Sequence, residues 1–377
     1  MAEPLKNQYG PEIPARIADM IAHVYPAFPK RAFLRDALAG YEALELMPRG
    51  RHIARALRSH LPQDVPAALD ILLASLDAPY AKNGGSLASF LFMPHTMYVA
   101  AYALEHFDAA MRAQHALTQR FTAEFSIRPF IEKYPEQTLA QLRQWTRDPS
   151  PHVRRLVSEG TRPRLPWAPR LRALQRDPRP AIELLELLKD DPEPYVRRSV
   201  ANHLNDIGKD HPGLLSAIAR RWLENAGPER AWIVRHALRS AIKRGDAGAL
   251  AVSGFGAKAE VAVRRAAITP ARPRIGGKVT IAFDLVNTKP RAQRVLADLR
   301  VHYVKSSGKT GPKVFKLKTV ELAPKAALHF EKTLSLADLT TRRHHPGRHR
   351  VEVLLNGRAT YIGGFQLTAA ARRRRAE

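Results

Sequence analysis

The chain has 377 residues, more than one hydrophobic core ordinarily serves, so we expect two domains or an extended repeat array. Its 61 lysines and arginines outnumber 35 acidic residues, and the net charge of +26 favours a polyanionic partner, most often nucleic acid. The absence of cysteine excludes disulfides, zinc–thiolate sites and cysteine nucleophiles, and no apolar run approaches the ~18 residues of a membrane helix.

The amino-terminal half has the pattern of short helices. Its first residues, MAEPLKNQYGPE, lack the charged and then apolar segments of a signal peptide, so we expect a cytoplasmic protein that does not engage a membrane. Up to about Arg244, apolar residues recur at helical spacing, as at Ile13, Ile17 and Met20. Proline-containing breaks such as YPAFPK and RDPSP divide this half into short helices.

A motif is repeated within the helical half. DPSPHVRRLV begins at Asp148 and DPEPYVRRSV begins at Asp191, 43 residues later. A weaker copy places Val234 and Arg235 at the matching positions. A period of about 40–47 residues is typical of HEAT repeats, whose paired helices stack into a solenoid. We therefore expect an all-α HEAT-like α-solenoid over residues 1–245.

Each copy of the motif has the features of a helix start. Asp148 and Asp191 are expected to cap a helix by accepting hydrogen bonds from its first N–H groups, and the prolines that follow suit its first turn. Val153, Leu156 and Val157 then form one buried stripe. Arginines on another face of the stacked copies would line the solenoid with a basic surface suited to a DNA backbone.

The pattern changes after residue 245. The Gly/Ala-rich stretch 246–258 is interpreted as a linker, and alternation of period two over 259–370 predicts about seven short strands in an all-β immunoglobulin-like sandwich. Its turns NTKPRAQR, KSSGKTGPK and TTRRHHPGRHR are basic, and residues 257–377 carry +18 of the net charge. We expect these loops to contact DNA, although solvated loops without a partner stay an alternative. The basic tail 371–377 is expected to be disordered.

Familiar cofactor and metal sequences are not found. The chain contains no phosphate-binding Gly loop of the Walker type, and its fifteen histidines are scattered. The stretch RRHHPGRHR lacks carboxylates, and its arginines would repel a cation. We therefore expect no cofactor and no metal.

Glu159 departs from the repeat pattern. When the copies are aligned on their valines, it takes the position held by Asn202 and Ser240, so a basic face carries one carboxylate. A carboxylate directed at a polyanion costs binding energy, so its presence on this face indicates a functional role. The alternative is a structural pair with Arg155 at i,i+4, worth ~0.3–0.5 kcal/mol.

Two further residues have the same ambiguity. Glu124, in FTAEFSIRPF, is either a functional carboxylate or the partner of Arg128 on a helix surface. Trp167, in RLPWAP, is either a packing wedge or a platform for a ligand.

Taken together, these segments resemble a known family. The run SEGTRPRLPW (158–167), preceded by DPSPHVRR and by FTAEFSIRPFIEKYPE (121–136) and followed by YVRRSVANHLNDIGKDHP (195–212), resembles the bacterial DNA alkylation repair glycosylases built from HEAT-like repeats. With the opening EPLKNQYG, it is most similar to the AlkC branch of the AlkC/AlkD superfamily. The resemblance covers roughly residues 1–245, and the basic sandwich resembles the immunoglobulin-like domain appended in some members of that branch.

The resemblance implies a monofunctional alkylbase DNA glycosylase. Such an enzyme hydrolyses the N-glycosidic bond to cationic N-alkylated bases in duplex DNA, such as N3-methylcytosine, N3-methyladenine and N1-methyladenine, as the first step of base excision repair. By match to the family, Glu159 would stabilise the oxocarbenium-like sugar and orient water, with Glu124 as the second carboxylate. Trp167 would contact the cationic nucleotide through its π face, for ~0.5–2 kcal/mol. We expect no deep pocket for a flipped base.

The remaining expectations concern DNA contacts and rival functions. We expect a monomer that binds double-stranded DNA in the bacterial nucleoid. A non-catalytic HEAT-repeat DNA-binding scaffold is the main alternative, and an RNA-binding module, supported by charge alone, is the second. The candidates for DNA contact are Arg155, Arg162, Arg164, Arg198, Asn202, Lys209, Arg235, Arg342, Arg343 and Arg348.

Overall fold

The structure, a computed structural model, describes residues 5–78, 88–255, 259–339 and 342–369. The chain forms two compact units. The first comprises Met1–Asp210 and Ala226–Ala237, and the second comprises His211–Asn225 and Leu238–Glu377. This division does not follow the predicted boundary at residue 245, because α13 (Pro212–Leu223) packs against a later helix of the second unit.

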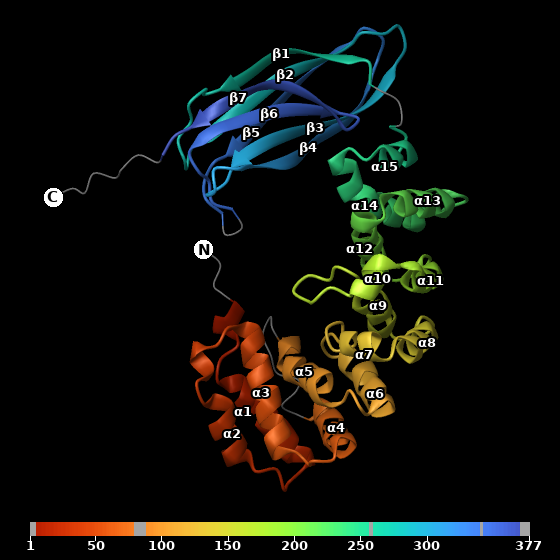
Figure 1. Ribbon diagram of the computed structural model, residues 1–377, viewed down its shortest axis with the longest axis vertical. Coiled ribbons are helices and arrows are strands. Elements are labelled where there is room, and N and C mark those ends of the chain that lie inside the picture. Colours follow the sequence, from red (N-terminus) through yellow and green to blue (C-terminus); the bar gives the residue numbers. More distant parts are fainter. Residues whose placement is uncertain (1–4, 79–87, 256–258, 340–341, 370–377) are drawn as a thin grey trace, which may run out of the picture. The chain divides into compact units, whose positions relative to one another are not determined.

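Short helices build the first unit, as the proline breaks predict (Figure 1). The elements are η1 (Leu5–Gln8), α1 (Glu12–Val24), α2 (Lys30–Leu38), η2 (Tyr41–Ala43), α3 (Leu46–His60), α4 (Val65–Ala74), η3 (Ser75–Asp77), η5 (Ala88–Phe92), α5 (Met93–Tyr102), α6 (Phe107–Thr118), α7 (Arg128–Lys133), α8 (Pro135–Trp145), α9 (Pro151–Gly160), α10 (Arg172–Arg176), α11 (Arg179–Leu188) and α12 (Pro194–Asp210). The helix α14 (Pro228–Arg244) begins in this unit and ends in the second.

The repeated motif starts two helices that pack together. The helices α9 and α12 form one layer, and α8 and α11 lie beside them as the other (Figure 1). The predicted stripe is confirmed, since Val153, Leu156 and Val157 are all fully buried. Burying three aliphatic side chains of this size stabilises the helix pair by ~1.5–3 kcal/mol each.

The prediction that Asp148 and Asp191 cap these helices is wrong in its detail. The helices begin at Pro151 and Pro194, three residues after each aspartate. Asp148 Oδ1 accepts a hydrogen bond from the N–H of Ser150 at 2.8 Å. In the second copy, Asp191 Oδ1 accepts one from the N–H of Glu193 at 2.9 Å. Each aspartate therefore forms a turn that leads into the helix. The prolines do occupy the first helical turn, as predicted.

The first arginine of the motif joins one repeat to the next. Arg154 donates to Asp191 through Nε (2.6 Å) and Nη2 (3.1 Å), and also to the carbonyl of Asp148 at 2.8 Å. The Arg154 and Asp191 side chains are 12% and 3% exposed. Arg197, the same residue in the next copy, bonds the carbonyls of Asp191 and Pro192. The repetition therefore encodes a structural clamp as well as a surface.

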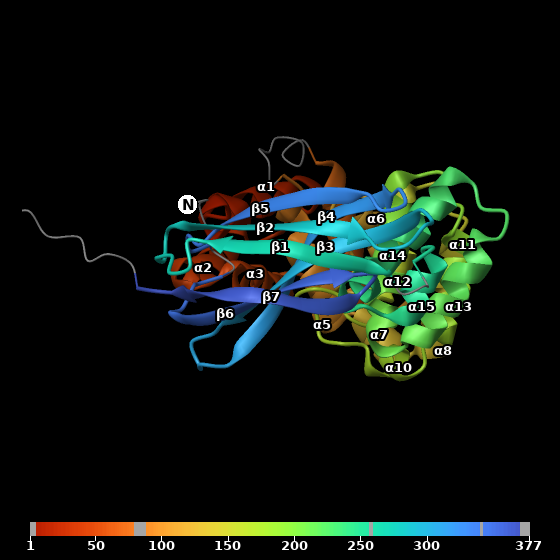
Figure 2. The same ribbon diagram turned by 90° about the horizontal axis from the view of Figure 1, so that it is seen from above.

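The second unit contains the predicted immunoglobulin-like sandwich. Its strands are β1 (Val261–Thr269), β2 (Lys278–Asn287), β3 (Gln293–Val304), β4 (Thr310–Leu322), β5 (Ala327–Ser335), β6 (Gly347–Leu355) and β7 (Arg358–Leu367). One sheet has the order β1-β2-β5 and the other β4-β3-β6-β7, with antiparallel pairing throughout (Figures 1 and 2). Alternate residues of the strands, such as Val279, Ile281 and Phe283, fill the space between the sheets.

The basic turns of the sandwich lie at both of its ends. The β3–β4 turn and the segment before β6 share one end, because Val304 at the end of β3 contacts Gly347 at the start of β6. The β2–β3 connection lies at the other end, where Lys289 and Arg291 pair with Glu260. Exposed basic residues at the β3–β4 end include Lys305, Lys309, Arg343 and Arg348.

The stretch 246–258, interpreted as a linker, contains a short helix in its first half. Ala247–Val252 forms the helix α15, and Asp246 caps it by accepting the N–H of Ala249 at 2.8 Å. Alanine is the best helix former, and a capping aspartate stabilises the first turn. Leu250 and Phe255 then pack against Leu296 of β3. The tail 371–377 lies outside the described residues, and none of the helices within them is long and apolar enough to cross a membrane.

Candidate active site

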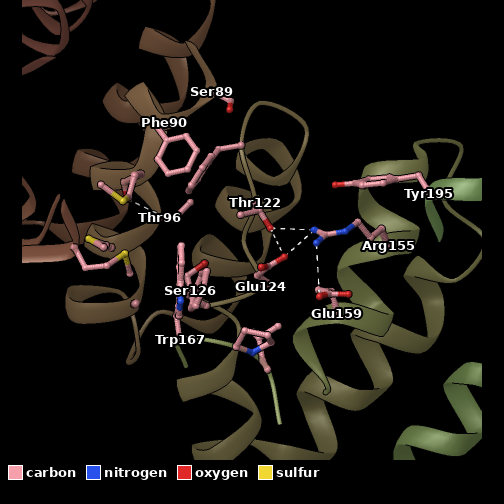
Figure 3. A pocket seen from close by; sticks show the side chains of 18 residues that line it. Ser89, Phe90, Thr96, Thr122, Glu124, Ser126, Arg155, Glu159, Trp167 and Tyr195 are labelled. Carbon is pink, nitrogen blue, oxygen red and sulfur yellow. Dashed lines mark hydrogen bonds and ion pairs between the residues drawn. The ribbon is translucent and has the colours of Figure 1, made fainter. Parts of the chain in front are cut away.

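A cavity of about 450 Å³ in the first unit brings Glu124, Arg155, Glu159 and Trp167 together (Figure 3). The side chains come from α9, from the turn before α7, and from the loop that follows α9. Phenylalanines and methionines from η5, α5 and the start of α3 complete the wall. Grooves elsewhere on the protein have similar volumes, of about 400 and 480 Å³, so the expectation that no deep pocket receives a flipped base stays a prediction.

Glu159 is held in one orientation at the end of α9. Its side chain is 8% exposed. Oε1 accepts a hydrogen bond from Arg162 Nη1 at 2.5 Å, and Oε2 accepts one from Ser199 Oγ at 2.5 Å. Arg162 Nε in turn donates a hydrogen bond to Asp206 Oδ2 at 2.8 Å. Charge-assisted bonds to both oxygens fix the carboxylate in place.

Glu124 lies opposite, in a turn and not on the helix surface that the sequence suggests. Its Oε2 accepts hydrogen bonds from Thr122 Oγ1 and Arg155 Nη1, each at 2.7 Å. Arg155 Nη2 lies 3.8 Å from Glu159 Oε1, and its guanidinium carbon lies 4.9 Å from the ring centre of Tyr195. Figure 3 shows Glu124 and Glu159 both pointing toward this guanidinium.

Trp167 is presented to the pocket by a constrained loop. Its side chain lines the cavity, yet the residue is 75% exposed. Its φ of 65° is in the left-handed region, which costs a bulky residue on the order of 1–3 kcal/mol. Strain of this kind persists where the surroundings impose it, and it is frequent at functional sites.

Arg128 supplies that constraint, and it does not pair with Glu124 as one alternative supposed. It is buried and donates to the carbonyls of Gly160 (3.0 Å), Arg162 (2.8 Å) and Pro169 (2.5 Å). Burial lowers the pKa of its guanidinium to about 10. These three bonds tie both ends of the Trp167 loop to the start of α7.

Gly160 allows the end of α9 to come close to this clamp. A β-carbon at this position would lie 2.6 Å from Ile127 Cγ2, so the glycine is needed for close packing. Its carbonyl is one of those held by Arg128.

Several of the predicted DNA contacts turn out to hold carboxylates. Arg155 and Arg162 are largely buried and bond the acidic groups described above, so a role for them as DNA contacts stays a prediction. Arg164 makes a bidentate pair with Asp210, at 2.7 and 2.5 Å. Lys209 bonds Asp206 at 2.7 Å and so supports the Arg162 partner from behind. The sequence pattern could not separate these roles, because each depends on a residue from another element.

Two predicted arginines do lie on the surface together. Arg198 and Arg235 are exposed and line a groove of about 400 Å³ between the starts of α12 and α14. Trp232, also in the groove, stacks on His236 with ring centres 5.0 Å apart. His236 Nε2 lies 3.2 Å from Asn202 Oδ1, so the predicted Asn202 supports this groove from α12.

The candidates in the sandwich lie at the β3–β4 end. Arg343 and Arg348 are exposed, and the Arg342 guanidinium lies 4.9 Å from the ring centre of Tyr303. Within the described ranges, no group of three or more histidine and acidic residues could hold a metal ion.

The most informative residues that the sequence analysis missed are Ser199 and His203 of α12. Ser199 bonds Glu159 directly. His203 Nδ1 donates to the carbonyl of Ser158 at 2.9 Å, and burial lowers the pKa of this imidazole to about 3. Both lie on the same buried face of α12 as Val196. Polar residues within an otherwise apolar stripe are the feature by which the sequence could have revealed them.

Comparisons with known proteins agree with the two-part architecture. A family model described as "DNA alkylation repair enzyme" matches residues 47–244, and one described as "Uncharacterised protein YhaZ, C-terminal Ig-like domain" matches residues 262–369. The uncharacterized protein YhaZ of Bacillus subtilis (strain 168) is 36% identical over 364 residues, which cover 96% of this chain and 99% of that protein.

A solved structure is similar over nearly the whole chain. It is the Pseudomonas fluorescens alkylpurine DNA glycosylase AlkC bound to DNA containing an abasic site analog. The two chains are 41% identical and superpose with a TM-score of 0.89, covering 97% of this chain and 100% of the other. The fold and the family thus rest on both sequence and structure.

Proposed function

The chain belongs to the DNA alkylation repair enzyme family, and from that premise we propose that it is a DNA glycosylase that removes cationic N-alkylated bases from duplex DNA. Family membership and the likeness to an alkylpurine glycosylase support a monofunctional enzyme. The proposal adds the substrate class, with N3-methylcytosine, N3-methyladenine and N1-methyladenine as its members, and the residues that act on it.

The observation that carries the proposal is the pair of carboxylates facing one cavity. Glu124 and Glu159 lie on either side of Arg155, and both line the same pocket as Trp167 (Figure 3). A carboxylate fixed by Arg162 and Ser199 needs little reorganisation when positive charge develops beside it. Such a site fits a reaction whose transition state is a cation.

Cleavage of the bond to a cationic base needs few further groups from the protein. Alkylation makes the base positively charged, so when the bond from C1′ to nitrogen breaks, its electron pair neutralises the base. The sugar left behind is oxocarbenium-like, and a water molecule adds to C1′ and loses a proton. We assign stabilisation of the sugar cation and orientation of the water to Glu159, the deeper and more rigidly held carboxylate. Glu124 adds negative potential that attracts the charged base, and a neutral base gains nothing from it.

Exposed basic side chains supply the DNA contacts in this proposal. Arg198 and Arg235 lie in one groove of the first unit, and Arg343 and Arg348 lie at one end of the sandwich. Contacts of this kind to phosphates position a protein without reading sequence. Binding as a monomer in the cytoplasm stays a prediction.

Base release from defined duplexes tests the function. Duplexes carrying one N3-methylcytosine, N3-methyladenine or N1-methyladenine are incubated with the protein, and unmodified duplex serves as the blank. We expect release from at least one cationic lesion and none from the blank. Protein that binds the duplexes tightly but releases no base from any of them would instead support the non-catalytic scaffold.

A further inference from the structure

Gly245 turns the chain from α14 into α15. Its φ of 79° is in the left-handed region, which glycine adopts without strain. The N–H of Gly245 donates to the carbonyl of Ile242 at 2.9 Å, and the N–H of Asp246 donates to that of Ala241 at 3.0 Å. These two bonds are those of a Schellman motif, which satisfies the last carbonyls of a helix. Since Asp246 also caps α15, the turn between the helices is fixed at both ends.

A second glycine lies in the turn between β6 and β7. Asn356 and Gly357 form this two-residue turn, with φ values of 46° and 79°. Asn-Gly is a favoured pair where both residues of a hairpin turn must be left-handed. The N–H of Asn356 donates to the carbonyl of Leu296 at 3.0 Å, and its Oδ1 accepts the N–H of Leu296 at 2.9 Å. The turn is therefore tied to the neighbouring strand β3.

The two glycines meet backbone to backbone. A β-carbon on Gly245 would lie 2.8 Å from the carbonyl oxygen of Gly357. A β-carbon on Gly357 would lie 2.7 Å from the α-carbon of Gly245 and 2.7 Å from Leu250 Cδ1. Carbon atoms pack at about 3.5–4.0 Å, so neither position has room for a side chain.

Apolar side chains surround this contact. Leu250 and Phe255 pack with Leu296 of β3 and with Ile242 of α14, in a cluster distinct from the core between the sheets. The Arg294 guanidinium lies 4.8 Å from the ring centre of Phe255 and covers it. All of these residues belong to the second unit. The end of α14 is thus docked on the sandwich and not merely tethered to it.

We propose that Gly245 and Gly357 form a joint that fixes the sandwich to the end of α14 and so positions it for DNA. We call this contact the glycine joint. The inference rests on the proposed function and goes beyond it, because it assigns positioning residues that touch neither the DNA nor the reacting bond. In the proposed function, Arg235 of α14 and the basic residues of the sandwich contact the same duplex.

A fixed joint favours binding through both sets of contacts. When one set is bound, a sandwich docked on α14 presents the other set at a high effective concentration. A sandwich that swings freely must first be ordered, and this ordering reduces affinity. The joint therefore affects how tightly the duplex is held, and the chemical step after binding does not depend on it.

The variant Gly357→Ala tests the joint, because its methyl group would force Gly245 and Leu250 away. Affinity is measured by fluorescence anisotropy on an unmodified duplex of about 20 base pairs, two helical turns. We expect it to weaken by about 10-fold. Single-turnover release from an N3-methylcytosine duplex at saturating protein should keep the wild-type rate.

Hydrogen exchange shows whether the joint has opened in the free protein. The amides of Leu250, Ser253 and Phe255 bond carbonyls within the segment that packs on β3. We expect them to exchange at least about 10-fold faster in Gly357→Ala, while amides of the strands that form the core keep their wild-type rates. This pattern separates local opening from damage to the whole unit.

Two further variants complete the test. Gly276→Ala imposes the same backbone strain, at a φ of 88°, but a β-carbon there would meet no atom within 4 Å, so amide exchange in α15 and duplex affinity should stay at wild-type values. Leu250→Ala loosens the joint without strain or clash and serves if Gly357→Ala does not fold. We expect it to shift exchange and affinity in the same direction.

Two results would overturn the proposal. Fast exchange in α15 with wild-type duplex affinity would show that the joint does not position the sandwich. Wild-type exchange in folded Gly357→Ala and Leu250→Ala would show that these contacts do not fix it. Base release by the wild type is measured independently of both, so failure of this inference and failure of the proposed function are distinguishable.

Discussion

The helices α9 and α12 begin with the same motif, yet they put its two arginines to different uses. The first arginine is structural in both copies, because Arg154 and Arg197 each bond the carbonyls of their own motif. The second differs. Arg155 lies between two carboxylates in a cavity, while Arg198 is exposed in a groove with Arg235. A repeated sequence thus preserves the scaffold and leaves one position per copy open for function.

The largest effect should come from the structural arginine of the first copy. Arg154→Met removes one partner of a buried ion pair and leaves Asp191 without its guanidinium, so we expect a loss of about 3 kcal/mol in the free energy of unfolding. Arg197→Met, the same change in the second copy, removes bonds to carbonyls and should cost about 1 kcal/mol. Urea unfolding of both variants measures the difference, and equal losses would contradict the clamp between repeats.

Loss of the second carboxylate, Glu124, should have a smaller effect, which is on the rate of base release. Glu124→Gln keeps the shape of the side chain but removes a negative charge that faces the cavity. We expect single-turnover base release to slow by about 10- to 100-fold, equivalent to ~1.4–2.7 kcal/mol. The same assay on Glu132→Gln, an exposed carboxylate on α7, provides the matched control. An unchanged rate in Glu124→Gln would remove this residue from the mechanism.

His203, which links α12 to α9, should make stability depend on pH. Burial holds its folded pKa at about 3, below the usual value of about 6.5, so the unfolded chain binds a proton that the folded protein does not. Stability from the neutral imidazole is full above pH 6.5 and is lost as pH falls toward 3, by ~2 kcal/mol between pH 6.5 and 5.

Unfolding of His203→Gln at both pH values checks this contribution. The variant should lose less stability on acidification than the wild type, because it lacks the buried imidazole. If the stability of His203→Gln falls with pH as steeply as that of the wild type, the buried imidazole does not titrate as described.

The smallest effect belongs to the exposed arginines. Arg198→Ala and Arg235→Ala should each weaken duplex affinity by about 3- to 10-fold and reduce the slope of log affinity against log salt by about 1. Fluorescence anisotropy at several salt concentrations measures both quantities. A loss of affinity with an unaltered salt slope would mean that these side chains do not meet phosphates.

The sequence predicts the fold well because its signals are local. The 43-residue spacing of the motif and the alternation after residue 258 are visible without knowledge of distant contacts. Glu159 could also be found, since it is an acid at a position where the other copies carry small polar groups.

What could not be predicted depends on residues that meet only after folding. The burial of Arg155 requires Glu124 from a turn and Tyr195 from the next repeat. The Arg128 clamp joins a helix start to carbonyls of a loop more than thirty residues later. A run of basic residues in the sequence therefore does not show which of their side chains are exposed, because buried carboxylates bond several of them.

Single-turnover base release and duplex affinity, measured together for Glu159→Gln and Arg198→Ala on N3-methylcytosine duplex, test the two uses of the motif most directly. We predict that Glu159→Gln slows release by at least about 100-fold while its affinity stays within about 3-fold of the wild type. Arg198→Ala should do the reverse, with weaker binding and a normal rate at saturation. Glu159→Gln that releases the base at the wild-type rate would contradict the account.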